Sequence, residues 1–291
     1  DGKICDEEAL ARWNDPELGF LSPDSFIPAL EQYKLIYKLD LYVLEHVLEK
    51  MKLQREAGFY VVPQSVNLSL MDFESCDVVE EIRRRVDEAG VDRSMITVEI
   101  TESVIGSDFD FMKKQVARFR ELGFPVWMDD FGSGYSSMNV LQQIHFDLIK
   151  FDMGFMRRFD EGDDSKIILT ELVKMAIGLG METVCEGVET AEQVEFLREI
   201  GCTRIQGYYY GKPIPFEGNM SLFRHGTRLE YENPSEAEYY AAIGRINLYD
   251  MSALVNENDE PLNHYFNTLP MCIIEVNGDR LRFNRCNRSY R

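Results

Sequence analysis

Residues 95–130 read MITVEITESVIGSDFDFMKKQVARFRELGFPVWMDD, and this stretch decides the fold. Two short β-rich runs, residues 95–101 and 125–129, flank a longer stretch with helical apolar spacing, Phe109–Glu121. Each run is mainly apolar and carries one acidic side chain near its end, Glu99 or Asp129. A strand, a helix and a second strand in this order predict one βαβ unit of a parallel sheet.

The same alternation extends from about residue 4 to residue 216. The predicted strands are residues 4–13, 60–68, 95–101, 125–129, 146–152, 182–186 and 203–206. Further helices are predicted at residues 39–56, 78–89, 165–179 and 191–199. The chain is therefore predicted to be an α/β protein with a parallel sheet, closed as a barrel or open. A (β/α)8 barrel needs eight strands, so we expect its first strand to precede residue 1.

Polar side chains stand near the ends of most of these apolar strands. They are Asn67, Glu99, Asp129, Lys150, Glu186 and Gln206. A charged group at the end of a buried strand is unfavourable unless it is paired or bound to a metal. In a barrel the strand ends converge on one face, where active sites lie. The pattern therefore predicts a functional site built from these side chains.

The composition limits the partners. The 291 residues have a net charge of −20, from 31 basic and 51 acidic residues, so we expect no DNA binding. A phosphate ligand would need bound cations to reverse the local sign. Six cysteines without C-x-x-C spacing predict the reduced thiols of a cytoplasmic protein. We find no signal peptide and no apolar run of the ~20 residues that a membrane span needs; a tether outside residues 1–291 stays open.

Seven motifs in a fixed order resemble the EAL-domain family. They are EALARW (8–13), NLS (67–69), EITES (99–103), DDFGSGYSS (129–137), KFD (150–152), EGVET (186–190) and QGYYYGKP (206–213). The resemblance implies a modified TIM (β/α)8 barrel with one antiparallel strand near its start. It also implies hydrolysis of cyclic di-GMP (c-di-GMP) to linear pGpG in bacterial signalling. The family's first strand, which carries a Gln-Pro pair that contacts substrate, would precede this sequence.

The resemblance further implies two divalent cations, Mg²⁺ or Mn²⁺, held by hard oxygen ligands. The metal ligands carried over are Glu8, Asn67, Glu99 and Asp129 for one cation, and Asp129, Asp130 and Glu186 for the other. The catalytic residues are Glu8, Asp129, Lys150 and Glu186, with Lys150 orienting the attacking water. Lys150 as a salt-bridge partner is an alternative that is compatible with this role. Ca²⁺ is expected to inhibit, because its coordination is longer and looser.

Substrate contacts are carried over in the same way. Arg12 would grip a phosphate, although a surface arginine is the alternative. Leu10, two residues after Glu8, would share its side of a strand and pack on a base. The other expected substrate contacts are Asp152, Glu189, Gln206 and Pro213. The tyrosines at 208–210 would either pack on guanine or belong to the core or rim. Glu102 resembles the glutamate that anchors the loop at 130–137.

The chain is predicted to contain a barrel at residues 1–216, a linker with a helix (236–254) at 217–262, and a third segment at 263–291. The third segment resembles the opening of a PAS domain, with strands 272–276 and 280–285 joined by a turn at Asn277-Gly278. A packing extension is the alternative. Family partners are a second copy of the chain, an upstream GGDEF domain and a downstream PAS domain.

Two other functions stay open. A catalytically silent c-di-GMP sensor would keep the fold, although silent members usually lack a metal ligand, the lysine or the loop. An unrelated metal-dependent barrel enzyme would need carboxylates at strand ends but not the Asp-Asp-Phe-Gly-Ser-Gly loop.

Overall fold

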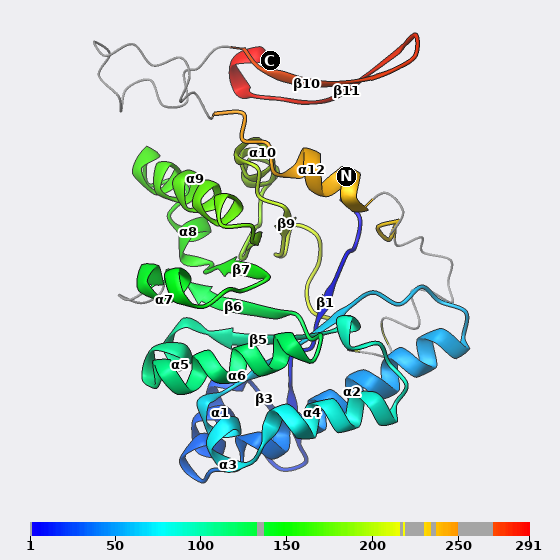
Figure 1. Ribbon diagram of the computed structural model, residues 1–291, viewed down its shortest axis with the longest axis vertical. Coiled ribbons are helices and arrows are strands. Elements are labelled where there is room, and N and C mark those ends of the chain that lie inside the picture. Colours follow the sequence, from blue (N-terminus) through cyan, green and yellow to red (C-terminus); the bar gives the residue numbers. More distant parts are fainter. Residues whose placement is uncertain (1, 133–136, 216–217, 219–229, 234–236, 250–269) are drawn as a thin grey trace. The chain divides into compact units, whose positions relative to one another are not determined.

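The computed structural model describes residues 2–132, 137–215, 218, 230–233, 237–249 and 270–291 (Figure 1). The chain forms two compact units. The first unit consists of Asp1–Leu148 and Lys212–Asn233, and the second of Ile149–Gly211 and Pro234–Arg291.

Parallel strands form the centre of the first unit. They are β1 (Glu7–Glu8), β4 (Gln64–Leu68), β5 (Ile96–Thr101) and β6 (Val126–Phe131), hydrogen-bonded in this order. The three pairings are parallel, so the antiparallel strand that the resemblance implies is not among these four described strands. Four predicted strands are thus confirmed.

The first predicted strand is much shorter than residues 4–13. After β1 the chain turns back as a separate antiparallel hairpin of β2 (Trp13–Asp15) and β3 (Gly19–Leu21). The Asp15 carboxylate accepts hydrogen bonds from the backbone N–H groups of Glu17 and Leu18, and these bonds lower the pKa of Asp15. This side-chain turn connects β2 to β3, and the hairpin was not predicted.

Helices cover the strands of the first unit. They are α1 (Pro23–Gln32), α2 (Ile36–Glu56), α3 (Leu70–Ser75), α4 (Val78–Glu88), α5 (Glu102–Ser107), α6 (Phe109–Glu121) and α7 (Ser137–Gln143), with a 3-10 turn at Arg93–Met95. Helix α2 packs on β4 and α6 on β6 (Figure 1). Helix α6 has its predicted bounds because the Asp108 side chain caps its start and Gly123, at φ 91°, turns the chain just after its end.

The strands of the second unit are β7 (Leu148–Phe151), β8 (Glu182–Cys185) and β9 (Arg204–Ile205). The first residue of β7, Leu148, is counted with the first unit. Its helices are α8 (Gly154–Arg157), α9 (Asp163–Gly178) and α10 (Ala191–Ile200), and α9 packs on β8. The backbone N–H of Glu186 donates to the Phe151 carbonyl, and that of Gln206 donates to the Cys185 carbonyl. The segments that follow β7 and β9 therefore flank the end of β8, as the predicted βα alternation requires.

The tail contains α12 (Ala237–Gly244), β10 (Cys272–Asn277), β11 (Arg280–Cys286) and a 3-10 turn at Arg288–Tyr290. Helix α12 is shorter than the predicted helix, because the described residues 245–249 are not helical. Residues 236 and 250–254 of that prediction fall outside the described residues, as do 263–269 of the third segment. The predicted hairpin is confirmed, but its turn is shifted. Asn277 pairs with Arg280, so Gly278 and Asp279 make the turn, with Gly278 at φ 59°.

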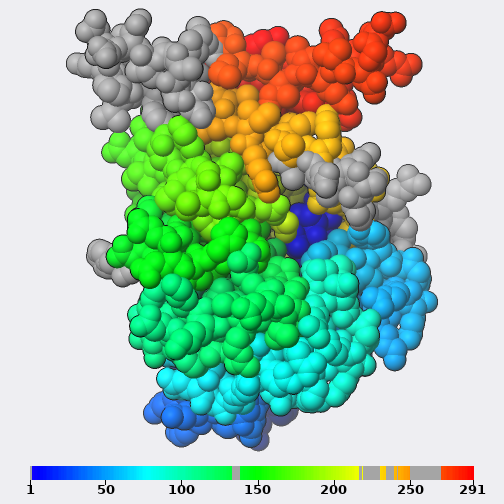
Figure 2. Space-filling view, in the orientation of Figure 1, coloured from blue at the N-terminus to red at the C-terminus, as the bar shows by residue number. Residues whose placement is uncertain are grey.

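Strands β10 and β11 are coloured orange to red in Figure 2, and exposed apolar side chains lie opposite one another on them. Ile274 lies opposite Phe283, and Val276 opposite Leu281, and all four side chains are exposed.

The tail also covers the end of α10. The Arg285 guanidinium donates to the carbonyl oxygens of Arg198, Ile243, Gly244 and Ile246. The Glu199 side chain is 6% exposed; it accepts a hydrogen bond from the Tyr249 hydroxyl and forms an ion pair with Arg291. The Leu248 backbone N–H donates to the Glu199 carbonyl. Tail residues thus satisfy both the backbone and the side chain of the last turn of α10.

The cysteines are free thiols, as expected from their spacing. Cys185 and Cys202 are buried, and burial raises the pKa of Cys202 to about 11, so this thiol stays neutral. Within the part of the chain that the structure describes, no helix is both long and apolar enough to cross a bilayer.

Candidate functional site

The first unit brings polar side chains together at the carboxyl ends of neighbouring parallel strands. Asn67 lies opposite Glu99 in the β4–β5 register, and its side-chain amide donates to Glu8 Oε1 at 3.0 Å. Glu99 and Asp129 are buried, with 1% and 8% of their surface exposed. A buried carboxylate is unfavourable unless a positive charge or hydrogen bonds compensate it. Three carboxylates and one amide oxygen are a donor set that fits a hard divalent cation.

The end of β6 makes a tight backbone turn. Asp130 has a φ of 55°, in the left-handed region that few residues other than glycine adopt, and the Asp129 carboxylate accepts its N–H at 2.9 Å. Such strain often marks functional sites. Two residues on, the Gly132 N–H donates to Glu102 Oε2 at 3.2 Å, and Glu102 is buried. This contact is the one expected if Glu102 anchors the loop at 130–137. Residues 133–136 of that loop lie outside the described residues.

The second unit contributes a buried ion pair. Lys150 Nζ lies 2.8 Å from Glu186 Oε1, and the two side chains are 1% and 15% exposed. A buried ammonium is tolerated because a carboxylate pairs with it. The salt-bridge interpretation of Lys150 is therefore confirmed, whereas its catalytic role stays a prediction. The acidic residues that could hold a metal ion include Glu186 here, and Asp129 and Asp130 in the first unit.

Two glycines let the loop after β8 touch its neighbours, the loop after β9 at Gly207 and the segment after β7 at Gly187. A Cβ atom on Gly207 would lie 2.1 Å from the Val188 carbonyl oxygen and 2.3 Å from its nitrogen. The Val188 N–H donates to the Gln206 carbonyl at 3.2 Å, and the Val188 carbonyl accepts the Tyr209 N–H at 3.0 Å. Gly187, at φ 70°, has a similar close neighbour, because its Cβ would lie 2.6 Å from that of Met153. The close packing that Gly187 and Gly207 allow, in the EGVET and QGYYYGKP motifs, was not predicted.

The expected substrate contacts in the first unit are exposed. Strand β1 ends at Glu8, so the prediction that Leu10 shares a side of a strand with Glu8 is wrong, and Leu10 is 41% exposed. Arg12 is also exposed and donates to the Ala11 carbonyl. Pro213 is exposed as well.

Those in the second unit are mostly fixed through the backbone. The Asp152 carboxylate accepts the Gly154 N–H at 2.8 Å. Gln206 is half-buried and bonds through its backbone, and Glu189 is exposed. The tyrosines at 208–210 are 59%, 46% and 52% exposed, so the core alternative for them is wrong. A role of these residues in substrate binding stays a prediction.

A buried pair of acids supports the segment after Asn67. Ser69 and Asp72 form a capping box that starts α3, with the Ser69 N–H 2.5 Å from Asp72 Oδ2. Burial, the neighbouring charge and hydrogen bond of Asp72, and the charge of Glu31 raise the pKa of Asp40 to about 9. Burial also raises the pKa of Asp72. At neutral pH the pair therefore shares a proton, and a hydrogen bond between the two carboxyl groups joins α2 to α3.

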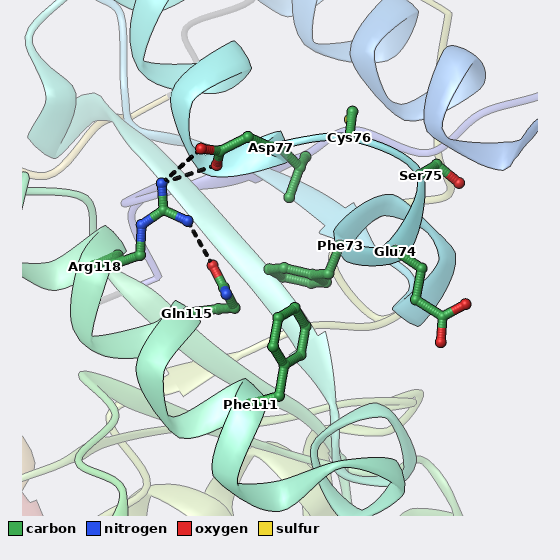
Figure 3. Close-up of a pocket in the computed structure, with 9 residues that line it drawn as sticks. Phe73, Glu74, Ser75, Cys76, Asp77, Phe111, Gln115 and Arg118 are labelled. Atoms are coloured by element: carbon green, nitrogen blue, oxygen red, sulfur yellow. Dashed lines mark hydrogen bonds and ion pairs between the residues drawn. The ribbon is translucent and has the colours of Figure 1, made fainter.

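A surface pocket of about 320 Å³ lies where α3, the start of α4 and α6 meet (Figure 3). The rings of Phe73 and Phe111 face it, and Arg118 donates to both Asp77 oxygens and to Gln115 Oε1 (Figure 3). None of the predicted site residues lines this pocket. Its arginine is paired with Asp77 and Gln115, and we assign the pocket no function.

Comparison with known proteins finds relatives that are named for the turnover of c-di-GMP. The EAL domain model matches residues 1–213. The "Cyclic di-GMP phosphodiesterase NbdA" of Pseudomonas aeruginosa is 34% identical over 224 residues, which are 77% of this chain and 29% of NbdA. The "Bifunctional diguanylate cyclase/cyclic di-GMP phosphodiesterase MucR" of the same organism is 32% identical over 217 residues, 75% of this chain and 32% of MucR. The chain thus spans less than a third of the length of these relatives.

Solved structures agree with the sequence comparison. The PaMucR phosphodiesterase in complex with c-di-GMP matches with a TM-score of 0.69 and 32% identity, covering 73% of this chain and 86% of that chain. The EAL enzyme Bd1971, bound to cAMP and cyclic di-GMP, matches with a TM-score of 0.70 and 25% identity, covering 76% and 60%. These matches confirm the predicted α/β fold of TIM-barrel type. With the family model covering most of its length, the chain belongs to the EAL domain family.

Proposed function

We propose that the chain hydrolyses c-di-GMP to linear pGpG with the help of two divalent cations, Mg²⁺ or Mn²⁺. The observation that carries the proposal is the buried ion pair of Lys150 and Glu186, at 2.8 Å. A lysine with 1% of its side chain exposed has few uses other than to act on a bound ligand or to hold a carboxylate in place. The relatives named as c-di-GMP phosphodiesterases support the choice of substrate.

The metal ligands proposed are those of the family. Glu8, Asn67, Glu99 and Asp129 would hold one cation, and Asp129, Asp130 and Glu186 the other. When bound, the cations would activate a water molecule and neutralise charge on the phosphodiester. A chain with a net charge of −20 needs such local compensation before it can hold an anionic substrate.

The remaining roles belong to the chain's own side chains. Lys150, held by Glu186, would orient the attacking water, and its positive charge would favour loss of the water's proton. Arg12 would grip a phosphate, and Leu10 and Pro213 would contact the bases. Asp152, Glu189 and Gln206 would bind polar groups of the substrate. Glu102 would hold the loop after Asp130 through the Gly132 N–H.

The test is turnover by the purified chain. We would incubate it with c-di-GMP and Mg²⁺ or Mn²⁺, measure pGpG by chromatography, and compare Glu8→Ala and Lys150→Ala. Lys52→Ala is the matched control, because the Lys52 side chain is 72% exposed. Metal-dependent pGpG that is lost in both site variants and kept in the control supports the proposal.

Two other outcomes would change the assignment. Tight c-di-GMP binding without product favours the silent sensor, provided that a longer chain with the preceding strand is also inactive. Neither binding nor turnover by that longer chain would refute both functions.

The proposed organisation follows the family. Residues 1–216 would form the phosphodiesterase domain, 217–262 a linker and 263–291 the start of a PAS-like domain, in a cytoplasmic signalling protein. A homodimer and an upstream GGDEF domain are the proposed partners.

A further inference from the structure

Gln193 uses both ends of its side-chain amide, and it is 7% exposed. Its Oε1 accepts the backbone N–H groups of Glu189 and Thr190 at 2.7 and 3.1 Å. Its Nε2 donates to the Met156 carbonyl at 3.2 Å. The first contacts form a capping box with Thr190 at the start of α10, but the contact with Met156 is not part of a helix cap.

The two segments that Gln193 joins both carry proposed site residues. One segment, residues 186–190, follows β8 and begins with Glu186. The other, residues 150–156, begins with Lys150 at the end of β7. The segments also meet where the Glu186 N–H donates to the Phe151 carbonyl at 3.1 Å and where Gly187 approaches Met153. Gln193 adds the contact farthest from the Lys150–Glu186 pair, and it is a side-chain contact that a substitution can remove.

We propose that Gln193 is a positioning residue, which fixes the relative placement of Lys150 and Glu186 by bridging the segments that carry them. This inference rests on the proposed phosphodiesterase function. Its physical basis is that a side-chain amide accepts N–H groups through its oxygen and at the same time donates to a carbonyl through its nitrogen. A bridge that loosens lets the lysine and the glutamate shift, and a displacement near 1 Å costs about 100-fold in rate.

A purely local role is the competing explanation. If Gln193 merely starts α10, then its acceptor half matters and its donor half does not. Gln193→Glu separates the halves, because a carboxylate still accepts the two N–H groups but repels the Met156 carbonyl. Gln193→Met removes both halves at similar volume. Thr170→Val is the matched control, since Thr170 is buried in the same unit and donates to the Lys166 carbonyl at 2.7 Å.

The experiment measures kcat, KM and thermal unfolding of these three variants and the wild-type chain. We expect kcat to fall about 10–100-fold in Gln193→Met and Gln193→Glu, with much smaller changes of KM. Thr170→Val should lose similar thermal stability and keep its kcat. In Gln193→Glu, activity relative to wild type should recover as the pH falls, because a protonated carboxyl can again donate to Met156.

Hydrogen exchange gives a readout that does not depend on turnover. In Gln193→Met, amides in both segments, 186–190 and 153–156, should exchange faster than in wild type. Faster exchange confined to 186–192 would reduce Gln193 to a helix cap and overturn the proposal. So would a kcat that falls no further than in Thr170→Val. A longer wild-type chain with the preceding strand that also shows no turnover would refute the proposed function alone, and the exchange of residues 153–156 would still decide on the bridge.

Discussion

Replacing Gly207 by alanine would place a methyl carbon 2.1 Å from the Val188 carbonyl oxygen and 2.3 Å from its nitrogen. Ordinary contacts of a Cβ atom begin above 3 Å, so the two loops would have to separate by about 1 Å. The backbone hydrogen bonds of Val188 with Gln206 and Tyr209, at 3.2 and 3.0 Å, would not survive this shift. Two lost hydrogen bonds at about 1 kcal/mol each, with some residual strain, give a destabilisation of about 3 kcal/mol.

The assay combines thermal unfolding with c-di-GMP turnover. If the family-matched residues 1–213 unfold together, about 3 kcal/mol corresponds to a fall in Tm of about 6–12 °C. Turnover should fall further than stability explains at a temperature where the variant is folded, because Val188 lies between Glu186 and Glu189 in the sequence. Gly211→Ala is the control in the same motif, since a Cβ there meets nothing within 4 Å.

A Gly207→Ala chain with wild-type Tm and wild-type kcat would contradict the close approach of the two loops. Equal losses in Gly207→Ala and Gly211→Ala would instead show that the whole segment is sensitive to lost glycine flexibility.

Three further predictions concern other parts of the site. The pKa of Asp40 is raised to about 9 in the folded chain, so the stability that its protonated form provides is complete below about pH 4 and is lost as the pH rises towards 9. The Tm should therefore fall between pH 6 and 9, and it should fall less in Asp40→Asn. Glu102→Ala should lower kcat more than it weakens c-di-GMP binding measured by calorimetry, and Glu102→Gln should recover part of the loss, because it still accepts the Gly132 N–H. Chelation by EDTA should abolish turnover and Mg²⁺ or Mn²⁺ should restore it, whereas turnover in Ca²⁺ equal to that in Mg²⁺ would argue against two closely spaced cation sites.

The regular elements were predictable because their signals are local. Helix α6 follows from apolar spacing between Asp108, which caps it, and Gly123, which ends it. Strands β5 and β6 follow from apolar runs with Glu99 and Asp129 near their ends, and their parallel direction follows from the βα alternation. The register that sets Asn67 beside Glu99 was not predicted.

The contacts between distant segments were not predictable in the same way. The bridge from Gln193 to Met156 spans 37 positions, and no sequence pattern records it. The contacts of Gln193 at the start of α10 could have been predicted, since Thr190 and Gln193 have the spacing of a capping box. The hairpin of β2 and β3 was missed because its turn is made by the Asp15 side chain with Glu17 and Leu18, and composition alone does not reveal such turns.

The cover on the end of α10 affects how the protein can be shortened. The family match ends at residue 213, yet the second compact unit includes Pro234–Arg291. A chain cut after residue 216 would keep every family motif but would expose Glu199, which loses Tyr249, Arg291 and the Leu248 N–H as partners. Biochemical work on a minimal catalytic fragment would then report on a protein with a frayed α10, the helix that carries Gln193 at its other end.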